Sequence, residues 1–201
     1  MIKNIIFDFG NVLGWTLADN TTKTFVEDAE DRKLIRQVVF DPSDWDQLNR
    51  GTMTDEEMVA KICSQLPKEL HQDACTVYNN WTNTSTPVYG MASLVSELKE
   101  KGYRIYLLSN ATKTFSERYL DIPWMVSILK QFDGLVFSAV VGLAKPDREI
   151  YEYVLNTYEL TADECLFVDD CKENIEGAEV LGIHGYLFDG DAKKLRTYIY
   201  K

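Results

Sequence analysis

The chain has 201 residues, of which 45% are hydrophobic and 12% aromatic, so it can fold around a sizeable core and is not a disordered chain. Lysine and arginine number 21 against 32 aspartates and glutamates, which gives a net charge of −11. This acidity argues against nucleic acid and anionic membrane as partners, because both repel a negative protein.

The N-terminal apolar run is too short for a signal peptide, and no segment has the length of a membrane span. The cysteines lack the paired spacing of a zinc site, and the chain has only two histidines. The four cysteines are Cys63, Cys75, Cys165 and Cys171. We therefore expect reduced thiols and a cytoplasmic location. The sequence leaves the oligomeric state open.

The first predicted strand covers residues 2–8, because Ile5, Ile6 and Phe7 form the continuous apolar run of a strand buried in a parallel sheet. Residues 17–83 have a polar, helical pattern without a clear strand. Within them Thr54 and Glu57 have capping-box spacing, which predicts the start of a helix.

From residue 91 onward, helix and strand patterns alternate. The predicted helices are 91–102, 146–158 (with Pro146 in its first turn) and 173–182, and the predicted strands are 103–110, 135–138, 165–170 and 185–190. Strands separated by helices imply right-handed βαβ units and a parallel sheet covered on both faces. The predicted fold class is therefore α/β, with a Rossmann-like core over residues 1–16 and 84–201 and a helical insertion over residues 17–83. The insertion returns to the sheet through Pro87.

Polar residues stand where the predicted strands end. Asp8 follows the first strand, Lys145 lies a short loop beyond another, and the pairs Ser109-Asn110 and Asp169-Asp170 end two more. Because the carboxyl ends of parallel strands share one crevice, we expect these side chains to meet in a ligand site. A strand-terminal aspartate or serine often only caps the next helix. Helix capping does not account for all of them at once.

The chemistry of this set indicates phosphoryl transfer. Clustered carboxylates repel one another unless a cation neutralises them, and Mg²⁺ is the cation that prefers carboxylate and phosphate oxygens. Ser109 and Lys145 offer a hydroxyl and an ammonium to a bound phosphate, and Asn110, next to Ser109, is a further candidate for phosphate binding. An aspartate can act as the nucleophile by forming an aspartyl-phosphate, which splits the reaction into two steps. Asp8-Phe9-Gly10 also spells the kinase DFG motif, but the motifs that precede it in a kinase cannot fit before residue 8.

The motifs "IIFDFGNVL", "IYLLSN", "GLAKPDREIY" and "FVDDCKENIEGA" occur in the order found in the haloacid dehalogenase superfamily of hydrolases, which this sequence resembles. The resemblance implies that Asp8 is nucleophile and metal ligand, Ser109 binds phosphate and Lys145 steadies both. It implies that Asp170 ligates Mg²⁺ directly and Asp169 through water. It also implies a helical cap domain at the insertion. "DFGNVL" resembles the small bacterial sugar-phosphate phosphatases, glucose-1-phosphate phosphatase among them.

Gly10 departs from the pattern of the superfamily's phosphatases, which usually have a general acid/base aspartate at this position. Losing a positioned acid typically costs about 10²- to 10⁴-fold in rate. The carbonyl of Gly10 can still ligate the metal. A sugar 1-phosphate suits this gap, because its anomeric oxygen leaves more readily than an ordinary alkoxide. Asp19, or a water held by Asp169, is a candidate replacement for the acid.

Two alternatives stay open beside a phosphatase for a small phosphorylated metabolite. A dehalogenase also lacks the second aspartate but works without metal, which the retained Asp169-Asp170 pair argues against. A binding or regulatory protein could keep the phosphate site without turnover. Trp45 and Arg50 of the insertion, and Trp15 just before it, are candidates for substrate contact; the alternative is that the tryptophans pack the insertion's own core and Arg50 faces solvent.

Overall fold

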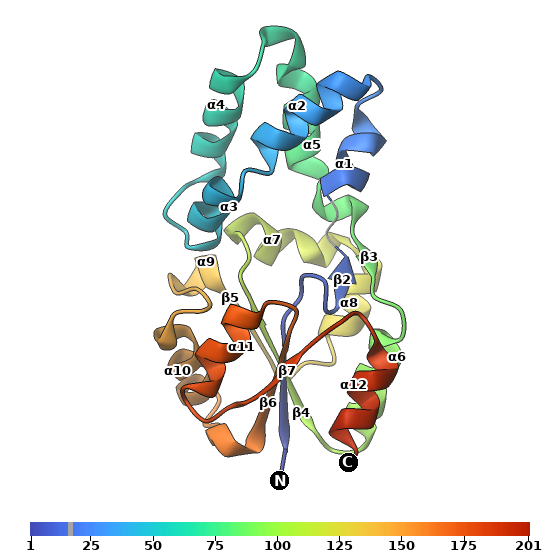
Figure 1. The fold of residues 1–201 in the computed structure, drawn as a ribbon, viewed down its shortest axis with the longest axis vertical. Helices are drawn as coiled ribbons and strands as arrows, with labels where there is room; N and C mark the ends of the chain where they lie inside the picture. The colour runs from blue at the N-terminus through green and yellow to red at the C-terminus, as the bar shows by residue number, and fades with distance from the viewer. Residues whose placement is uncertain (16–17) are drawn as a thin grey trace.

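The computed structural model describes residues 1–15 and 18–201, and it consists of a sheet covered by helices with a separate helical region above it (Figure 1). The sheet has five parallel strands in the order β5-β4-β1-β6-β7. These strands are β1 (Asn4–Phe7), β4 (Arg104–Ser109), β5 (Gly134–Phe137), β6 (Cys165–Asp169) and β7 (His184–Leu187). The predicted α/β fold class is confirmed.

The N-terminal strand β1 lies at the centre of the sheet. Its apolar residues Ile5, Ile6 and Phe7 are at most 1% exposed, as expected for a strand covered on both faces. Parallel pairing with β4 and β6 places the ends of all three strands at the same edge. Asp8 follows directly at that edge, where its main-chain N–H donates to Val168 O at 2.9 Å.

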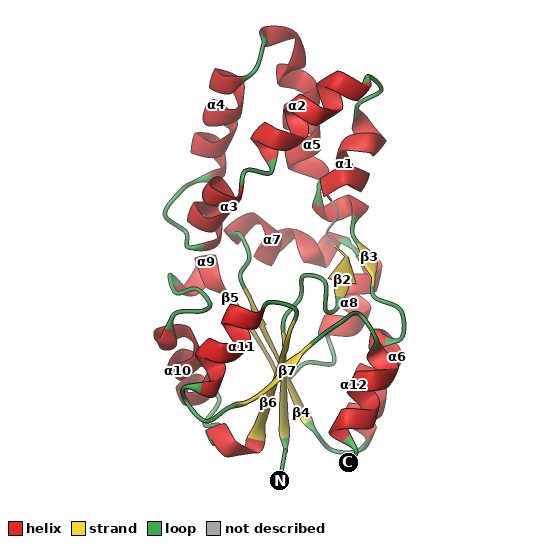
Figure 2. Ribbon diagram, in the orientation of Figure 1, coloured by secondary structure: helices red, strands yellow, loops and turns green. Residues whose placement is uncertain are grey.

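Helices cover both faces of the sheet (Figure 2). The helices of this part are α6 (Met91–Glu100), α7 (Lys113–Arg118), α8 (Pro123–Leu129), α9 (Ser138–Val141), α10 (Arg148–Thr157), α11 (Lys172–Glu179) and α12 (Ala192–Ile199). On one face, Phe7 and Leu107 belong to a hydrophobic core with helices α6, α8 and α12; on the other, Ile6 and Phe167 pack with α10 and α11.

The helical region, residues 18–80, has a hydrophobic core of its own, in which Ile35, Met58 and Ile62 are fully buried. Its helices are α1 (Ala18–Phe25), α2 (Ala29–Val39), α3 (Pro42–Asn49), α4 (Asp55–Gln65) and α5 (His71–Asn80). The predicted capping box is confirmed: Thr54 caps α4, and the side chains and main-chain N–H groups of Thr54 and Glu57 bond reciprocally.

A short antiparallel ribbon of β2 (Gly14–Trp15) and β3 (Thr86–Pro87) lies between the helical region and the sheet. The sequence pattern did not predict this ribbon, because two-residue strands carry no periodicity. The predicted boundary between core and insertion, residues 16 and 17, lies outside the described residues.

The structure corrects the prediction for Pro146 and adds helices. α10 begins at Arg148 with Asp147 as its N-cap, so Pro146 precedes the helix, and its peptide bond with Lys145 is cis. Helices α7, α8 and α12 were not predicted from the sequence, because they have only six to eight residues and therefore show little periodicity. Within the described residues, no helix combines the length and apolar character needed to cross a membrane.

Candidate active site

Three carboxylates meet at the carboxyl edge of the sheet. Asp8 follows β1, Asp169 ends the neighbouring strand β6 and Asp170 follows it, and one oxygen from each lies within 4.8 Å of the others. Asp8 and Asp169 are 8% and 0% exposed, whereas Asp170 faces solvent. These three residues were predicted from the sequence to lie together, and in the structure their carboxylates are adjacent.

Lys145 lies between two of these carboxylates. Its Nζ is 2.8 Å from Asp8 Oδ1 and 2.7 Å from Asp169 Oδ2, and the residue is only 2% exposed. Burial raises the pKa of Asp8 to about 7; Lys145 opposes this shift and Asp169 adds to it. Burial lowers the pKa of Lys145, but the two carboxylates outweigh it and leave that pKa above its ordinary value. The ion pair with Lys145 thus favours the charged form of Asp8, the nucleophile candidate, against the effect of burial.

The oxygens of Asp169 are occupied by N–H donors. Oδ1 accepts from Cys171 N at 2.8 Å, and Asn174 Nδ2 donates to both oxygens at 3.2 and 3.1 Å, in addition to the Lys145 contact. Asp170 Oδ2 instead accepts one bond from Asn11 Nδ2, at 2.9 Å. The sequence analysis did not single out Asn174 and Asn11, although both stand inside the motifs around Asp169 and Asp8.

Ser109 and Asn110 end β4, directly beside β1. Ser109 is 3% exposed and lies at the wall of a cavity described below. The Asn110 side chain exchanges two hydrogen bonds with the main chain of Lys145, since Nδ2 donates to Lys145 O and Oδ1 accepts from Lys145 N, both at 2.8 Å. The Asn110 amide therefore positions Lys145, a role that the sequence did not predict.

A cavity of about 180 Å³ opens beside Gly10 and Ser109 and reaches the helical region. Its described lining is Phe9, Gly10, Trp45, Asn49, Trp81, Ser109, Asn110, Ala111, Thr112 and Phe115. Trp45 thus lines the cavity and also packs inside the helical region, against Phe40 and Tyr78. Sequence reasoning missed Phe9, Trp81 and Phe115, because isolated aromatic residues give no sign of which neighbours the fold brings to them.

The other residues suggested for this crevice have different partners. Arg50 ends α3 and forms ion pairs with Asp46 and Asp147. Asp19, suggested as a replacement acid, is exposed on α1 and pairs with Arg36. Neither they nor Trp15 is among the described lining residues of the cavity.

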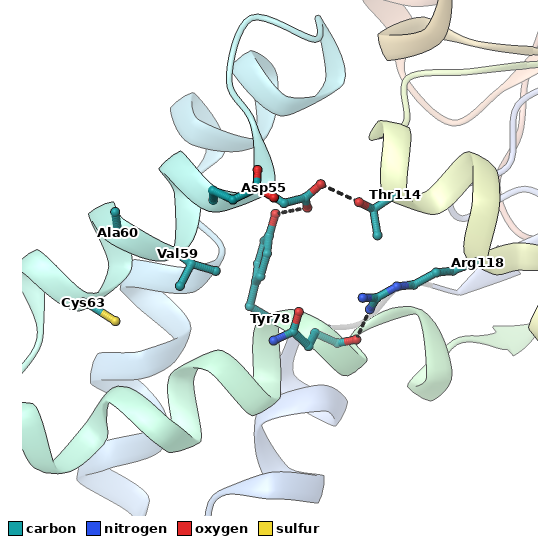
Figure 3. Close-up of a pocket in the computed structure, with 9 residues that line it drawn as sticks. Asp55, Val59, Ala60, Cys63, Tyr78, Thr114 and Arg118 are labelled. Atoms are coloured by element: carbon teal, nitrogen blue, oxygen red, sulfur yellow. Dashed lines mark hydrogen bonds between the residues drawn. The ribbon is translucent and has the colours of Figure 1, made fainter.

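A second cavity, of about 550 Å³, lies at the seam between the helical region and the sheet part (Figure 3). Here Asp55 of α4 accepts hydrogen bonds from Tyr78 Oη at 2.5 Å and from Thr114 Oγ1 of α7. Arg118 Nη1 donates to Asn79 O at 2.6 Å. Burial, and next the bond to Asp55, raises the pKa of Tyr78 above its ordinary value. These bonds fix the helical region over the carboxyl edge of the sheet.

The fold and these motifs define a hydrolase class. The model of the family described as haloacid dehalogenase-like hydrolase matches residues 2–182, and the chain therefore belongs to this family.

Two curated relatives match over most of their length. The sesquiterpene phosphatase astK of Aspergillus oryzae is 31% identical over 185 residues, which cover 91% of this chain and 88% of the relative. The D-ribitol-5-phosphate phosphatase of Bacteroides thetaiotaomicron is 28% identical over 200 residues, with 92% and 91% covered. Three further relatives are longer proteins, of which the chain spans 17%, 34% and 31%.

A solved structure supports the fold. A HAD family enzyme from Bacteroides thetaiotaomicron, crystallised as a mutant with magnesium and inorganic phosphate, superposes with a TM-score of 0.75 at 23% identity. The superposition covers 97% of this chain and 99% of that one. The chain is thus a haloacid dehalogenase-like hydrolase with phosphatases among its relatives.

Proposed function

We propose that the protein is a Mg²⁺-dependent phosphatase that hydrolyses a small phosphomonoester through an aspartyl-phosphate formed on Asp8. One observation carries this proposal: Lys145 pairs with the buried Asp8 carboxylate and favours its ionised form, directly beside Asp169 and Asp170. The phosphatase relatives support it, as does the magnesium and phosphate complex of the structural relative. The helical region is proposed to act as a cap that shields the reaction from water.

The donor set fits a magnesium ion. Two oxygens that ligate one Mg²⁺ at about 2.0–2.1 Å are at most about 4.2 Å apart, and the three carboxylates already lie within 4.8 Å. Asp8, the carbonyl of Gly10 and the exposed Asp170 would be direct ligands. Asp169, whose oxygens are occupied by N–H donors, would act through water. The ion would supply positive charge that draws phosphate into an acidic site.

In the proposed reaction, an oxygen of Asp8 attacks phosphorus while the bond from phosphorus to the ester oxygen breaks. The leaving oxygen keeps the bonding electrons and takes a proton from water. A second water then attacks the acyl phosphate, which releases inorganic phosphate and restores Asp8. The Ser109 hydroxyl, the main-chain N–H of Asn110 and the Lys145 ammonium would bind the phosphate oxygens. The side chain of Asn110 keeps Lys145 in place throughout.

The test of this function is hydrolysis of p-nitrophenyl phosphate, whose leaving group needs no acid. We expect turnover with Mg²⁺, loss to background with excess EDTA, and recovery when Mg²⁺ is added back, because the clustered carboxylates otherwise repel the phosphate. Mg²⁺ should also raise the Tm, because binding adds about 2.7 kcal/mol of stability at 100 times its Kd.

Two outcomes would contradict this proposal. Full activity in EDTA, together with halide release from a 2-haloacid, would favour a dehalogenase. Mg²⁺-dependent phosphate binding without any turnover would indicate a binding or regulatory protein. Calorimetric titration with inorganic phosphate separates the second case from an unfolded sample.

Gly10 leads to a prediction about the leaving group. Without an acid at this position, rates should rise steeply as the leaving alcohol becomes more acidic, so aryl phosphates and sugar 1-phosphates should outperform glucose 6-phosphate. Gly10→Asp should speed glucose 6-phosphate hydrolysis by about 10²-fold or more and change p-nitrophenyl phosphate little. In this loop the described residue with a positive φ is Asn11, at 54°. Gly10 is not among the residues with positive φ, so an aspartate at position 10 is not forced into the left-handed backbone conformation.

Gly10→Asn is the matched control, because it adds a side chain of the same shape without an acid. Both substrates should respond to it alike. If the native protein hydrolyses all leaving groups at equal rates, another residue already supplies the proton.

The substrate predicted from the sequence is a sugar phosphate. The named substrates of the two relatives differ, one being a polyol phosphate and the other a sesquiterpene. The residues that line the cavity beside Ser109 favour one of these substrate classes over the other.

A further inference from the structure

The cavity beside Ser109 is walled by aromatic rings from four separate segments. Phe9 follows the nucleophile candidate, Trp45 lies on α3, Trp81 follows α5 and Phe115 lies on α7. Trp81 stacks on Phe115 with ring centroids 5.6 Å apart, Trp45 meets Trp81 edge-on at 5.1 Å, and Phe9 meets Phe115 edge-on at 4.8 Å. These contacts join the four rings of Phe9, Phe115, Trp81 and Trp45 into one surface, which we call the aromatic wall.

Three polar side chains of the same cavity are hydrogen-bonded to the protein. The Trp45 indole N–H donates to Val39 O at 2.8 Å, and the Asn110 amide is bound to the main chain of Lys145. Thr112 Oγ1 accepts from Phe115 N at 3.0 Å as the N-cap of α7. Apart from the Asn49 side-chain amide, which has no hydrogen-bond partner among the described residues, a polyol in this cavity would exchange bonds to water mainly for contact with aromatic carbon, and a buried hydroxyl without a partner is unfavourable.

The size of the cavity limits the group that it can take. Its volume of about 180 Å³ is similar to that of an apolar cavity of about 150 Å³ known to bind benzene. A single six-membered ring or a five-carbon unit therefore fits this space, and a larger group would extend out through its open side. Since Ser109 lines the cavity, a phosphate bound there places its ester group against the aromatic wall.

We propose that the cavity selects phosphomonoesters whose leaving group is apolar and unsaturated or aromatic, with Trp45 and Trp81 as specificity-determining residues. This inference rests on the proposed phosphatase function and narrows it from sugar phosphates to esters of small apolar alcohols. Aromatic rings bind such groups through apolar contact and edge or stacking geometry. Gly10 suits the same substrates where the alcohol is a phenol, because a phenol leaves without a proton.

The test compares benzyl phosphate with glucose 6-phosphate, which differ in the leaving group but both release a primary alkoxide. Acetyl phosphate is the reference substrate, because its leaving group, the much more acidic acetate, is too small to reach the aromatic wall. We expect kcat/KM for benzyl phosphate to exceed that for glucose 6-phosphate by at least about tenfold. Trp45→Gln should lower the benzyl rate by about tenfold or more relative to acetyl phosphate, and Trp45→Phe should largely keep it.

Phe40→Leu is the matched control. Phe40 stacks on Trp45, with centroids 5.8 Å apart, but is not among the described residues of the cavity wall. Phe40→Leu should leave the ratio of kcat/KM for benzyl phosphate to kcat/KM for acetyl phosphate unchanged. A fall in this ratio that is confined to Trp45→Gln therefore reports on the aromatic wall and not on the fold of the helical region.

Three results would overturn the inference while the phosphatase function stands: glucose 6-phosphate turned over as well as benzyl phosphate, a benzyl-to-acetyl ratio unaffected by Trp45→Gln, or phosphocholine preferred over benzyl phosphate. The last would assign the rings to a quaternary ammonium group. No turnover of acetyl phosphate or p-nitrophenyl phosphate would instead remove the proposed function itself.

Discussion

Asp8→Asn should reduce hydrolysis of p-nitrophenyl phosphate to background, a loss of at least about 10⁴-fold, because the amide lacks the attacking oxyanion. The fold should survive. Burial raises the pKa of Asp8 to about 7, so burial already opposes its charge, and a neutral group of the same shape is tolerated there. The Tm and calorimetric binding of phosphate with Mg²⁺ measure the fold and the site separately from turnover.

Asp19→Asn is the control for this variant. Asp19 is exposed on α1 and pairs with Arg36, and it is not buried beside the other carboxylates as Asp8 is. Its substitution should therefore leave the rate unchanged. Substantial activity in Asp8→Asn with an unshifted Tm would show that Asp8 only ends a strand. A large loss in Asp19→Asn would restore Asp19 as the missing acid.

Lys145→Met should lower both activity and stability. It leaves the Asp8 and Asp169 carboxylates buried without their common ammonium, and breaking a buried ion pair costs about 3–5 kcal/mol. In a chain of this size that lowers the Tm by roughly 10 °C. Removing a group that stabilises transferring charge should slow turnover by roughly 10²–10³-fold or more.

The pH profile of this variant is a second readout. Lys145 is the group that most opposes the upward shift in the pKa of Asp8. Without it that pKa rises further, a smaller fraction of Asp8 is ionised at neutral pH, and the acid limb of kcat/KM moves to higher pH. Lys172→Met, which removes an exposed lysine paired with Glu176, is the control and should change neither the profile nor the Tm. An unshifted acid limb in Lys145→Met would contradict the assignment of Asp8 as the titrating nucleophile.

The central sheet was predictable because its inner strands β1, β4 and β6 are apolar on both faces. Within an alternating helix and strand pattern, a short continuous apolar run such as Ile5-Ile6-Phe7 is typical of a strand buried in a parallel sheet. The strand order was not predicted, since nothing in β1 itself states that its neighbours are β4 and β6. Short helices such as α7 were missed because six residues hold fewer than two turns of periodicity.

At the site, the charged groups could be predicted from the sequence, but the hydrogen bonds that hold them in position could not. Asp8, Asp169 and Lys145 each stand in a motif whose chemistry requires that residue type. Asn110 was predicted to bind phosphate, yet its side chain serves the backbone of Lys145, 35 residues away in sequence. A bond of this kind depends on how two loops meet. The aromatic wall was unpredictable for the same reason, because its rings come from four segments that only the fold brings together.

The central position of the first strand has a consequence for the order of folding. Asn4 pairs with Arg104 on one side and with Cys165 on the other. During synthesis at about 5–20 residues per second, β1 therefore waits on the order of 10 s before its second neighbour exists. The helical region, whose core comes from contiguous sequence, is complete long before that. Pairing across such separations is slow, and the apolar strand stays an unpaired edge that can join another chain. The strand that carries Asp8 is thus the first made and among the last enclosed.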